Sequence, residues 1–158
     1  MKQFLILITK TFVILLLTAA CLDAIYTYVY LRSSNRGKVE AVFNGKPTQY
    51  DVVILGTSRA NNHFVPDLFE KRGLKTFNYG MSGSHLFETA MLLELMMERN
   101  YKINTIILEA DLSLSNEKRD EGTTARFLPY IHHSSVIANH FKTEKEFSLW
   151  YYIPFIDT

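Results

Sequence analysis

Two short segments of this chain carry residues whose types and order could perform acyl chemistry. The first is an apolar run that ends at Leu55 and is followed by Gly56, Thr57 and Ser58. The second runs from Asn78 to Gly83 and reads Asn-Tyr-Gly-Met-Ser-Gly. In a parallel α/β sheet, turns that follow neighbouring strands meet at the carboxyl edge, where ligand sites form. One turn can then supply a hydroxyl nucleophile and the other a bare backbone N–H.

Each of these residues also has a purely structural interpretation. A serine hydroxyl needs a base before it can attack, and the oxyanion that results needs hydrogen-bond donors. Thr57 and Ser58 could instead cap the turn that follows them. Gly83 could serve only to allow a positive φ. The spacing alone leaves both interpretations open.

The elements that would position these turns are predicted from hydrophobic patterning. β-branched apolar runs predict strands, and Pro66 at a first helical position predicts a short helix before Gly73. The predicted strands cover 50–55, 75–78 and 104–110, and the predicted helices cover 66–72 and 85–101. Strands that alternate with helices at this spacing predict an α/β domain with a three-layer parallel sheet and right-handed crossovers.

The helix predicted over 85–101 has the strongest pattern. We expect Ser84 to cap it. Its glutamates and Arg99 are expected to lie mostly off the buried face. That face is expected to carry Leu86, Ala90, Leu93 and Met97, widened by Leu92 and Met96.

The N-terminal segment predicts a membrane anchor over residues 1–32. Between Thr11 and Leu31 the only formal charge is Asp23, and a helix of this length spans roughly the 30 Å of a bilayer core. Asp23 would be costly there unless it is paired or lies near the interface. Two alternatives stay open: a signal peptide cleaved after Thr18-Ala19-Ala20, and a lipoprotein signal acylated on Cys21.

The remaining composition sets limits on function. Lys and Arg number 17 against 16 Asp and Glu, and no basic stripe with interleaved aromatic residues predicts nucleic-acid binding. One cysteine excludes a disulfide framework. No Gly-x-Gly-x-x-Gly pattern supports nucleotide binding, and no cofactor is predicted. Residues 33–49 are expected to be a polar linker, and 50–158 an α/β domain. Because residues 150–156 are too apolar for a free tail, we expect that domain to be truncated, with a short helix opening at Thr143.

The chain resembles the SGNH (GDSL-type) hydrolase superfamily over roughly residues 50–115. The family's first block, a strand followed by Gly-x-Ser, matches Gly56 to Ser58, and its second block, Asn-x-x-x-Ser-Gly, matches Asn78 to Gly83. The resemblance implies that Ser58 is the nucleophile and that the Gly83 N–H is an oxyanion donor. The Ser58-Arg59 pair is similar to the family's membrane-anchored branch of the bacterial envelope.

The resemblance also implies residues that this sequence lacks. The family's third block brings an asparagine after the third strand, whereas the expected place here falls near Ser113, and Asn116 lies three residues later. Ser113, Asn116 and Arg59 are weaker substrate-binding candidates. No Asp-x-x-His, the family's base and its orienting carboxylate, occurs among the 158 residues. The five histidines are interpreted as surface or structural residues, and no metal site is predicted.

These observations lead to two functional hypotheses. In the first, a flavodoxin-like SGNH domain belongs to a serine esterase or acyltransferase that acts on an acylated glycan or other polymer of the cell envelope. Its single-pass anchor would lie in a bacterial cytoplasmic membrane, with the domain on the extracytoplasmic side. In the second, the chain is a catalytically inactive envelope binding or assembly module that keeps the fold without the Asp-x-x-His pair.

Overall fold

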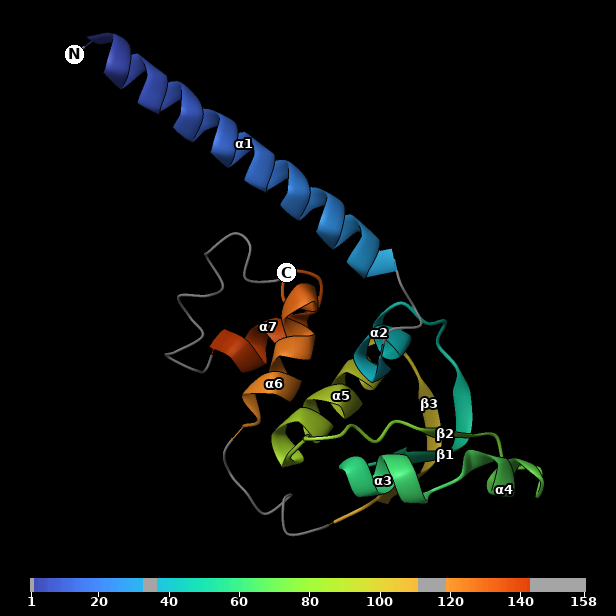
Figure 1. The fold of residues 1–158 in the computed structure, drawn as a ribbon. Helices are drawn as coiled ribbons and strands as arrows, with labels where there is room; N and C mark the ends of the chain where they lie inside the picture. Colours follow the sequence, from blue (N-terminus) through green and yellow to red (C-terminus); the bar gives the residue numbers. More distant parts are fainter. Residues whose placement is uncertain (1, 33–36, 111–118, 143–158) are drawn as a thin grey trace.

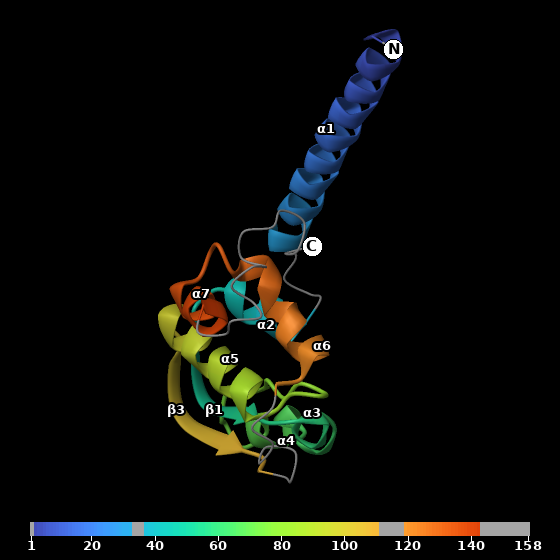
Figure 2. The same ribbon diagram turned by 90° about the vertical axis from the view of Figure 1, so that its left-hand side faces the viewer.

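A computed structural model describes residues 2–32, 37–110 and 119–142 (Figure 1). A long N-terminal helix projects from an α/β domain built on one small sheet (Figures 1 and 2). The elements in chain order are α1 (Lys2–Arg32), α2 (Lys38–Phe43), β1 (Gln49–Leu55), α3 (Ser58–His63), α4 (Pro66–Glu70), β2 (Thr76–Asn78), α5 (Leu86–Glu98), β3 (Lys102–Leu108), α6 (Glu121–Thr124), a 3-10 helix (Ala125–Tyr130) and α7 (Ser135–Lys142).

The sheet has three parallel strands in the order β2-β1-β3. β1 lies at the centre, and its Ile54 pairs with Asn78 of β2 and with Ile107 of β3. The prediction of a parallel α/β sheet is confirmed, and each predicted strand is present with shifted ends. β3 ends at Leu108, so residues 109 and 110 lie beyond it.

Helices cover the two faces of this sheet in different ways. Val53 and Leu55 of β1 point into the larger core, whose other buried members come mainly from α2, α5, the 3-10 helix and α7. Ile54 points to the opposite face and packs with Ala60 of α3 and Phe69 of α4. The connection from β1 to β2 therefore lies on one face, and α5, which leads to β3, lies on the other. This arrangement puts a topological switch point between β1 and β3.

The buried face of α5 differs from the predicted one. Leu86 and Met97 are 49% and 66% exposed, whereas Glu88 is fully buried. Burial of Glu88 is tolerated because its carboxylate accepts hydrogen bonds from His85 N, Asp120 N and the Thr124 hydroxyl. The inward-facing residues are Glu88, Thr89, Met91, Leu92, Leu95 and Met96.

The start of α5 corrects a second prediction. The N-cap residue is His85, and Ser84 does not cap the helix. The Ser84 hydroxyl donates instead to the carbonyl oxygens of Met81 and Gly56. It therefore joins two loops at the carboxyl edge of the sheet.

The prediction of a polar linker over 33–49 is wrong for residues 38–43. These residues form α2, and its Val39, Val42 and Phe43 are buried in the larger core. Their spacing of three and four residues gives one apolar helical face, although residues 33–49 as a whole are mostly polar. Tyr101 anchors α2 to the domain, because its hydroxyl lies 3.3 Å from the carbonyl oxygens of Ala41 and Val42.

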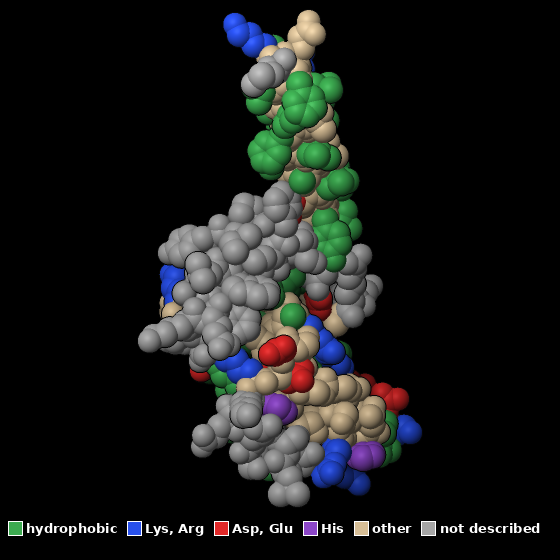
Figure 3. Space-filling view, turned by 60° about the vertical axis from the view of Figure 1, so that its left-hand side comes forward, with side chains coloured by type: hydrophobic (Ala, Val, Ile, Leu, Met, Phe, Trp, Pro, Cys, Tyr) green, Lys and Arg blue, Asp and Glu red, His purple; other side chains and the backbone are tan. Residues whose placement is uncertain are grey.

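The N-terminal helix α1 is long and apolar enough to cross a membrane over Lys2–Val29, and none of the tested span is buried inside the protein. Figure 3 shows hydrophobic side chains on the visible surface of this helix. Membrane anchors and signal sequences share this length and composition. The helix is thus confirmed, and its fate in the cell stays a prediction.

Glu98, at the end of α5, holds the start of α7. Its carboxylate accepts hydrogen bonds from the hydroxyls of Ser134 and Ser135 and from the backbone N–H groups of Ser135 and Val136. Burial alone would raise the pKa of Glu98, but these hydrogen bonds outweigh it and hold the pKa below its ordinary value. The ionised carboxylate therefore caps α7 from a neighbouring helix.

Replacing Glu98 with alanine is expected to lower the free energy of unfolding by about 1–2 kcal/mol at neutral pH, since it removes a helix cap. Because the pKa is lower in the folded state, this contribution is complete above the unfolded pKa and is lost as the pH falls through the folded pKa. Urea unfolding from about pH 7 to about pH 3 measures it, with the exposed Glu70→Ala as the control. A difference between E98A and wild type that stays constant across this range would contradict the role of the charge.

Candidate functional site

Ser58 lies just beyond the carboxyl end of β1, as the first residue of α3. Thr57 is the N-cap, and its side-chain oxygen accepts a hydrogen bond from the backbone N–H of Arg59 at 3.3 Å. The capping role that the sequence left open for both residues therefore belongs to Thr57. The Ser58 hydroxyl is partly exposed and makes no hydrogen bond within the described part of the chain.

Glu109 lies on the other side of this turn, directly after β3. Its carboxylate oxygen Oε2 accepts hydrogen bonds from the Thr57 backbone N–H at 3.2 Å and from the Thr57 hydroxyl at 2.9 Å. The backbone N–H of Glu109 donates to the carbonyl of Leu55 at 2.9 Å. Sequence reasoning placed Glu109 inside the third strand and missed it. A carboxylate at the carboxyl end of an apolar run was the signal that could have found it.

Gly56 is required where β1 approaches Glu109. Its φ is +140°, a backbone conformation that residues with a side chain rarely adopt. A Cβ at this position would lie 2.9 Å from the Cβ of Glu109 and 3.0 Å from its carbonyl oxygen. Only glycine lets the ends of β1 and β3 come this close.

The second turn is fixed to the first through the carbonyl of Gly56. This oxygen accepts hydrogen bonds from the backbone N–H of Met81 and from the Ser84 hydroxyl, each at 3.0 Å. The backbone N–H of Tyr79 donates to the carbonyl of Ile54 at 2.8 Å. The prediction that the two turns lie side by side is confirmed.

Gly83 closes the second turn with a φ of +86°. A Cβ there would lie 3.1 Å from the hydroxyl oxygen of Thr123 and 3.4 Å from Oδ1 of Asp120. Gly83 therefore meets a structural requirement whatever its chemical role. Its N–H makes no hydrogen bond among the described residues and is available as a donor.

Asp120 brings a carboxylate beside Gly83 that the sequence did not reveal. It caps α6 by accepting a hydrogen bond from the Thr123 backbone N–H at 2.7 Å. Hydrogen bonding with Thr123, and then the charges of His85 and Arg126, outweigh desolvation and hold the pKa of Asp120 below its ordinary value. An ionised carboxylate therefore lies beside the backbone of Gly83.

Asn78 holds α3, and with it Ser58, against the end of β2. Its side-chain amide donates to the carbonyls of Ala60 at 2.7 Å and Phe64 at 3.0 Å, and its Oδ1 accepts from the Gly80 N–H. A Cβ on Gly80 would lie 2.6 Å from the backbone nitrogen of Asn61, so α3 needs this glycine too. The first asparagine of the second motif is thus a structural anchor.

The weaker candidates are placed only in part. Arg59 follows Ser58 on α3 and is exposed. Ser113 and Asn116 lie outside the described residues, as does the helix predicted from Thr143. No group of three or more possible metal ligands gathers among residues 2–32, 37–110 and 119–142.

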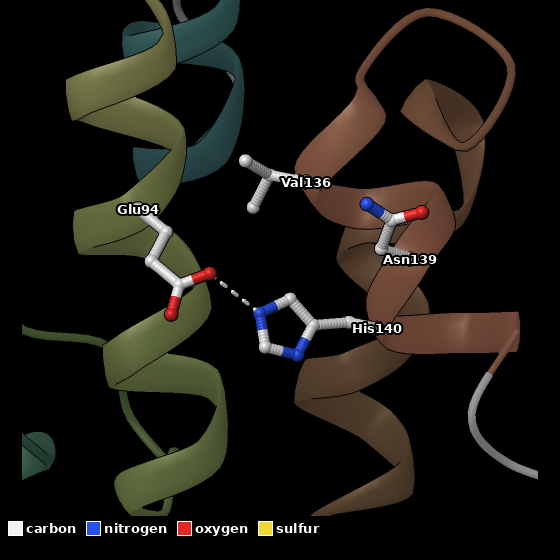
Figure 4. A pocket seen from close by; sticks show the side chains of 4 residues that line it. All are labelled: Glu94, Val136, Asn139 and His140. Carbon is white, nitrogen blue, oxygen red and sulfur yellow. Dashed lines mark hydrogen bonds and ion pairs between the residues drawn. The ribbon is translucent and has the colours of Figure 1, made fainter.

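The histidines occupy separate places. His63 is exposed at the end of α3, His85 is the N-cap of α5, and His132 and His133 are exposed beyond the 3-10 helix. His140 of α7 is hydrogen-bonded to Glu94 of α5, with Nε2 and Oε2 2.8 Å apart. The two residues line an open pocket of about 300 Å³ together with Val136 and Asn139. Figure 4 shows the four side chains and the contact between Glu94 and His140.

Replacing Gly56 with alanine is expected to destabilise the fold by about 3 kcal/mol, because backbone strain and the contact with Glu109 add together. Gly73→Ala is a matched control: its φ of +80° imposes strain, but a Cβ there meets nothing within 4 Å. It should cost only about 1 kcal/mol. If urea unfolding shows the same loss of stability for both variants, the close approach of β1 and β3 does not require glycine at position 56.

Comparison with known proteins gives no assignment for this arrangement. The chain matches no protein-family model, no curated protein and no solved structure. The function has to be argued from the turns and the residues that hold them.

Proposed function

We propose that this chain carries the nucleophile and an oxyanion donor of an SGNH-type acyl-transfer site. The observation that carries the proposal is the position of Ser58. Its hydroxyl has no hydrogen-bond partner in the described part of the chain, and its turn is bonded through Gly56 to the turn that ends in Gly83. A serine that only stabilised the helix start would use its hydroxyl there, and Thr57 does that instead.

The proposed chemistry is attack of Ser58 on an acyl carbonyl. The bond from Oγ to the carbonyl carbon forms, and the Oγ proton passes to a base. The oxyanion accepts hydrogen bonds from the N–H groups of Gly83 and Ser58, since the first N–H groups of a helix have no partner within it. The tetrahedral intermediate then collapses to an acyl-serine as the bond to the alcohol oxygen breaks. That alcohol takes the proton back from the base.

The proposed substrate is an acylated glycan or other envelope polymer. This rests on the resemblance to the membrane-anchored branch and is supported by the arrangement in Figures 1 and 2, where α3 lies at the end of the domain away from α1. If α1 spans a bacterial cytoplasmic membrane, Ser58 is held away from the lipid, on the side we propose to be extracytoplasmic. A water-exposed polymer can reach that position.

A second candidate function is a catalytically inactive envelope binding or assembly module. The observation that favours it is the lack of any Asp-x-x-His in the 158 residues. Without a base, Ser58 would remain a weak nucleophile, and the carboxyl edge would bind a polymer without cleaving it.

The two candidates are separated by Ser58→Ala in the detergent-solubilised full-length protein. The proposal predicts that hydrolysis of a small acyl ester and labelling by a fluorophosphonate are both abolished, because the attacking oxygen is gone. Ser82→Ala, which removes an exposed hydroxyl from the neighbouring turn, should keep both. Equal labelling of wild type and S58A would refute the enzyme, and binding of the polymer without labelling would favour the module.

The state of α1 is decided by the mass of the protein isolated from membranes. We expect the uncleaved chain, since the apolar run continues well past Cys21. A mass that lacks the first residues would identify a cleaved signal instead. A diacylglyceryl adduct on Cys21 would identify a lipoprotein.

A further inference from the structure

The switch point between β1 and β3 holds a carboxylate that the proposed chemistry does not use. In open α/β sheets, ligands bind where successive connections leave for opposite faces. Here the Glu109 side chain after β3 accepts hydrogen bonds from Thr57 in the turn after β1, and these bonds join the two strand ends. Ser58 is the next residue along the chain.

We propose that Glu109 is a positioning residue that fixes Ser58 through Thr57, an inference that rests on the proposed function. The Thr57 hydroxyl donates a hydrogen bond to Glu109. Its oxygen lone pair is therefore directed to the backbone N–H of Arg59, from which it accepts the capping hydrogen bond. The Thr57 N–H is held by the same carboxylate oxygen. Thr57 is 4% exposed and Glu109 is half-buried, so these contacts are partly shielded from water. Backbone and cap are thus fixed on both sides of Ser58.

Positioning of Thr57 requires a hydrogen-bond acceptor at the place of Glu109 Oε2 and does not require a negative charge there. Both hydrogen bonds end on Oε2, and Oε1 makes none within the described residues. A glutamine can put its carbonyl oxygen where Oε2 lies and leave its amide at the free position. An aspartate keeps the charge but is one methylene too short to reach Thr57. The pair E109Q and E109D therefore separates positioning from charge.

The test is the rate constant for fluorophosphonate modification of Ser58, read by mass spectrometry of the full-length protein and divided by the folded fraction. E109Q should stay within about threefold of wild type, while E109D and E109A should slow roughly 10- to 100-fold, because a misplaced nucleophile loses its orientation. A purely structural role would lower the melting temperature of these variants and leave the rate of the folded fraction unchanged.

Each outcome decides the matter. Fast labelling of folded E109D overturns the positioning role, and labelling of E109Q as slow as that of E109A shows that the charge itself acts. If E109D does not fold, Thr57→Val against Thr57→Ser gives the same decision, because only serine keeps the hydroxyl. If wild type is labelled no more than S58A, the proposed function fails and this inference fails with it. The labelling rate of E109D therefore tests the positioning role only if wild type is labelled at Ser58.

Discussion

The carboxyl edge of this domain depends on one residue without a side chain, Gly56. Its carbonyl accepts two hydrogen bonds from the turn after β2, and its Cα lies against Glu109 after β3. The ends of all three strands are therefore joined at one backbone position. Ser58, Gly83 and Glu109 are far apart in the sequence and share an edge because of it.

The helix that carries Ser58, α3, is stabilised by contacts with the other residues at the carboxyl edge of the sheet. α3 has six residues, too few to form a stable helix alone. Asn78 binds its carbonyls from the end of β2, and Gly80 leaves room for its backbone. The backbone carbonyl of Asn78 in turn accepts a hydrogen bond from Lys38 of α2, 2.6 Å away. The placement of Ser58 is thus a property of the whole domain.

Local patterns predicted the parts of the fold that local physics determines. The apolar runs at 50–55, 75–78 and 104–110 gave the three strands, and the long apolar N-terminal segment gave α1. Ser58 and Gly83 could be placed at neighbouring turns because a glycine turn after a buried strand is visible in the sequence. α2 was missed because its four apolar residues form a short stretch within residues 33–49, which are mostly polar.

Contacts between distant segments could not be predicted in the same way. Glu88 was expected outside the core, and its burial depends on hydrogen bonds from the distant Asp120 and Thr124 as well as from the neighbouring His85. Glu109 and Asp120 look like ordinary charged residues in the sequence. Their importance comes from Thr57 and Gly83, which only the folded chain brings to them.

The most direct measurement of the central claim is a crystal structure of the protein after reaction with a phosphonate. Our account predicts phosphorus bonded to Oγ of Ser58, with a phosphonyl oxygen about 2.7–3.1 Å from the Gly83 nitrogen. An adduct on another residue, or one on Ser58 whose oxygen points away from Gly83, would contradict it.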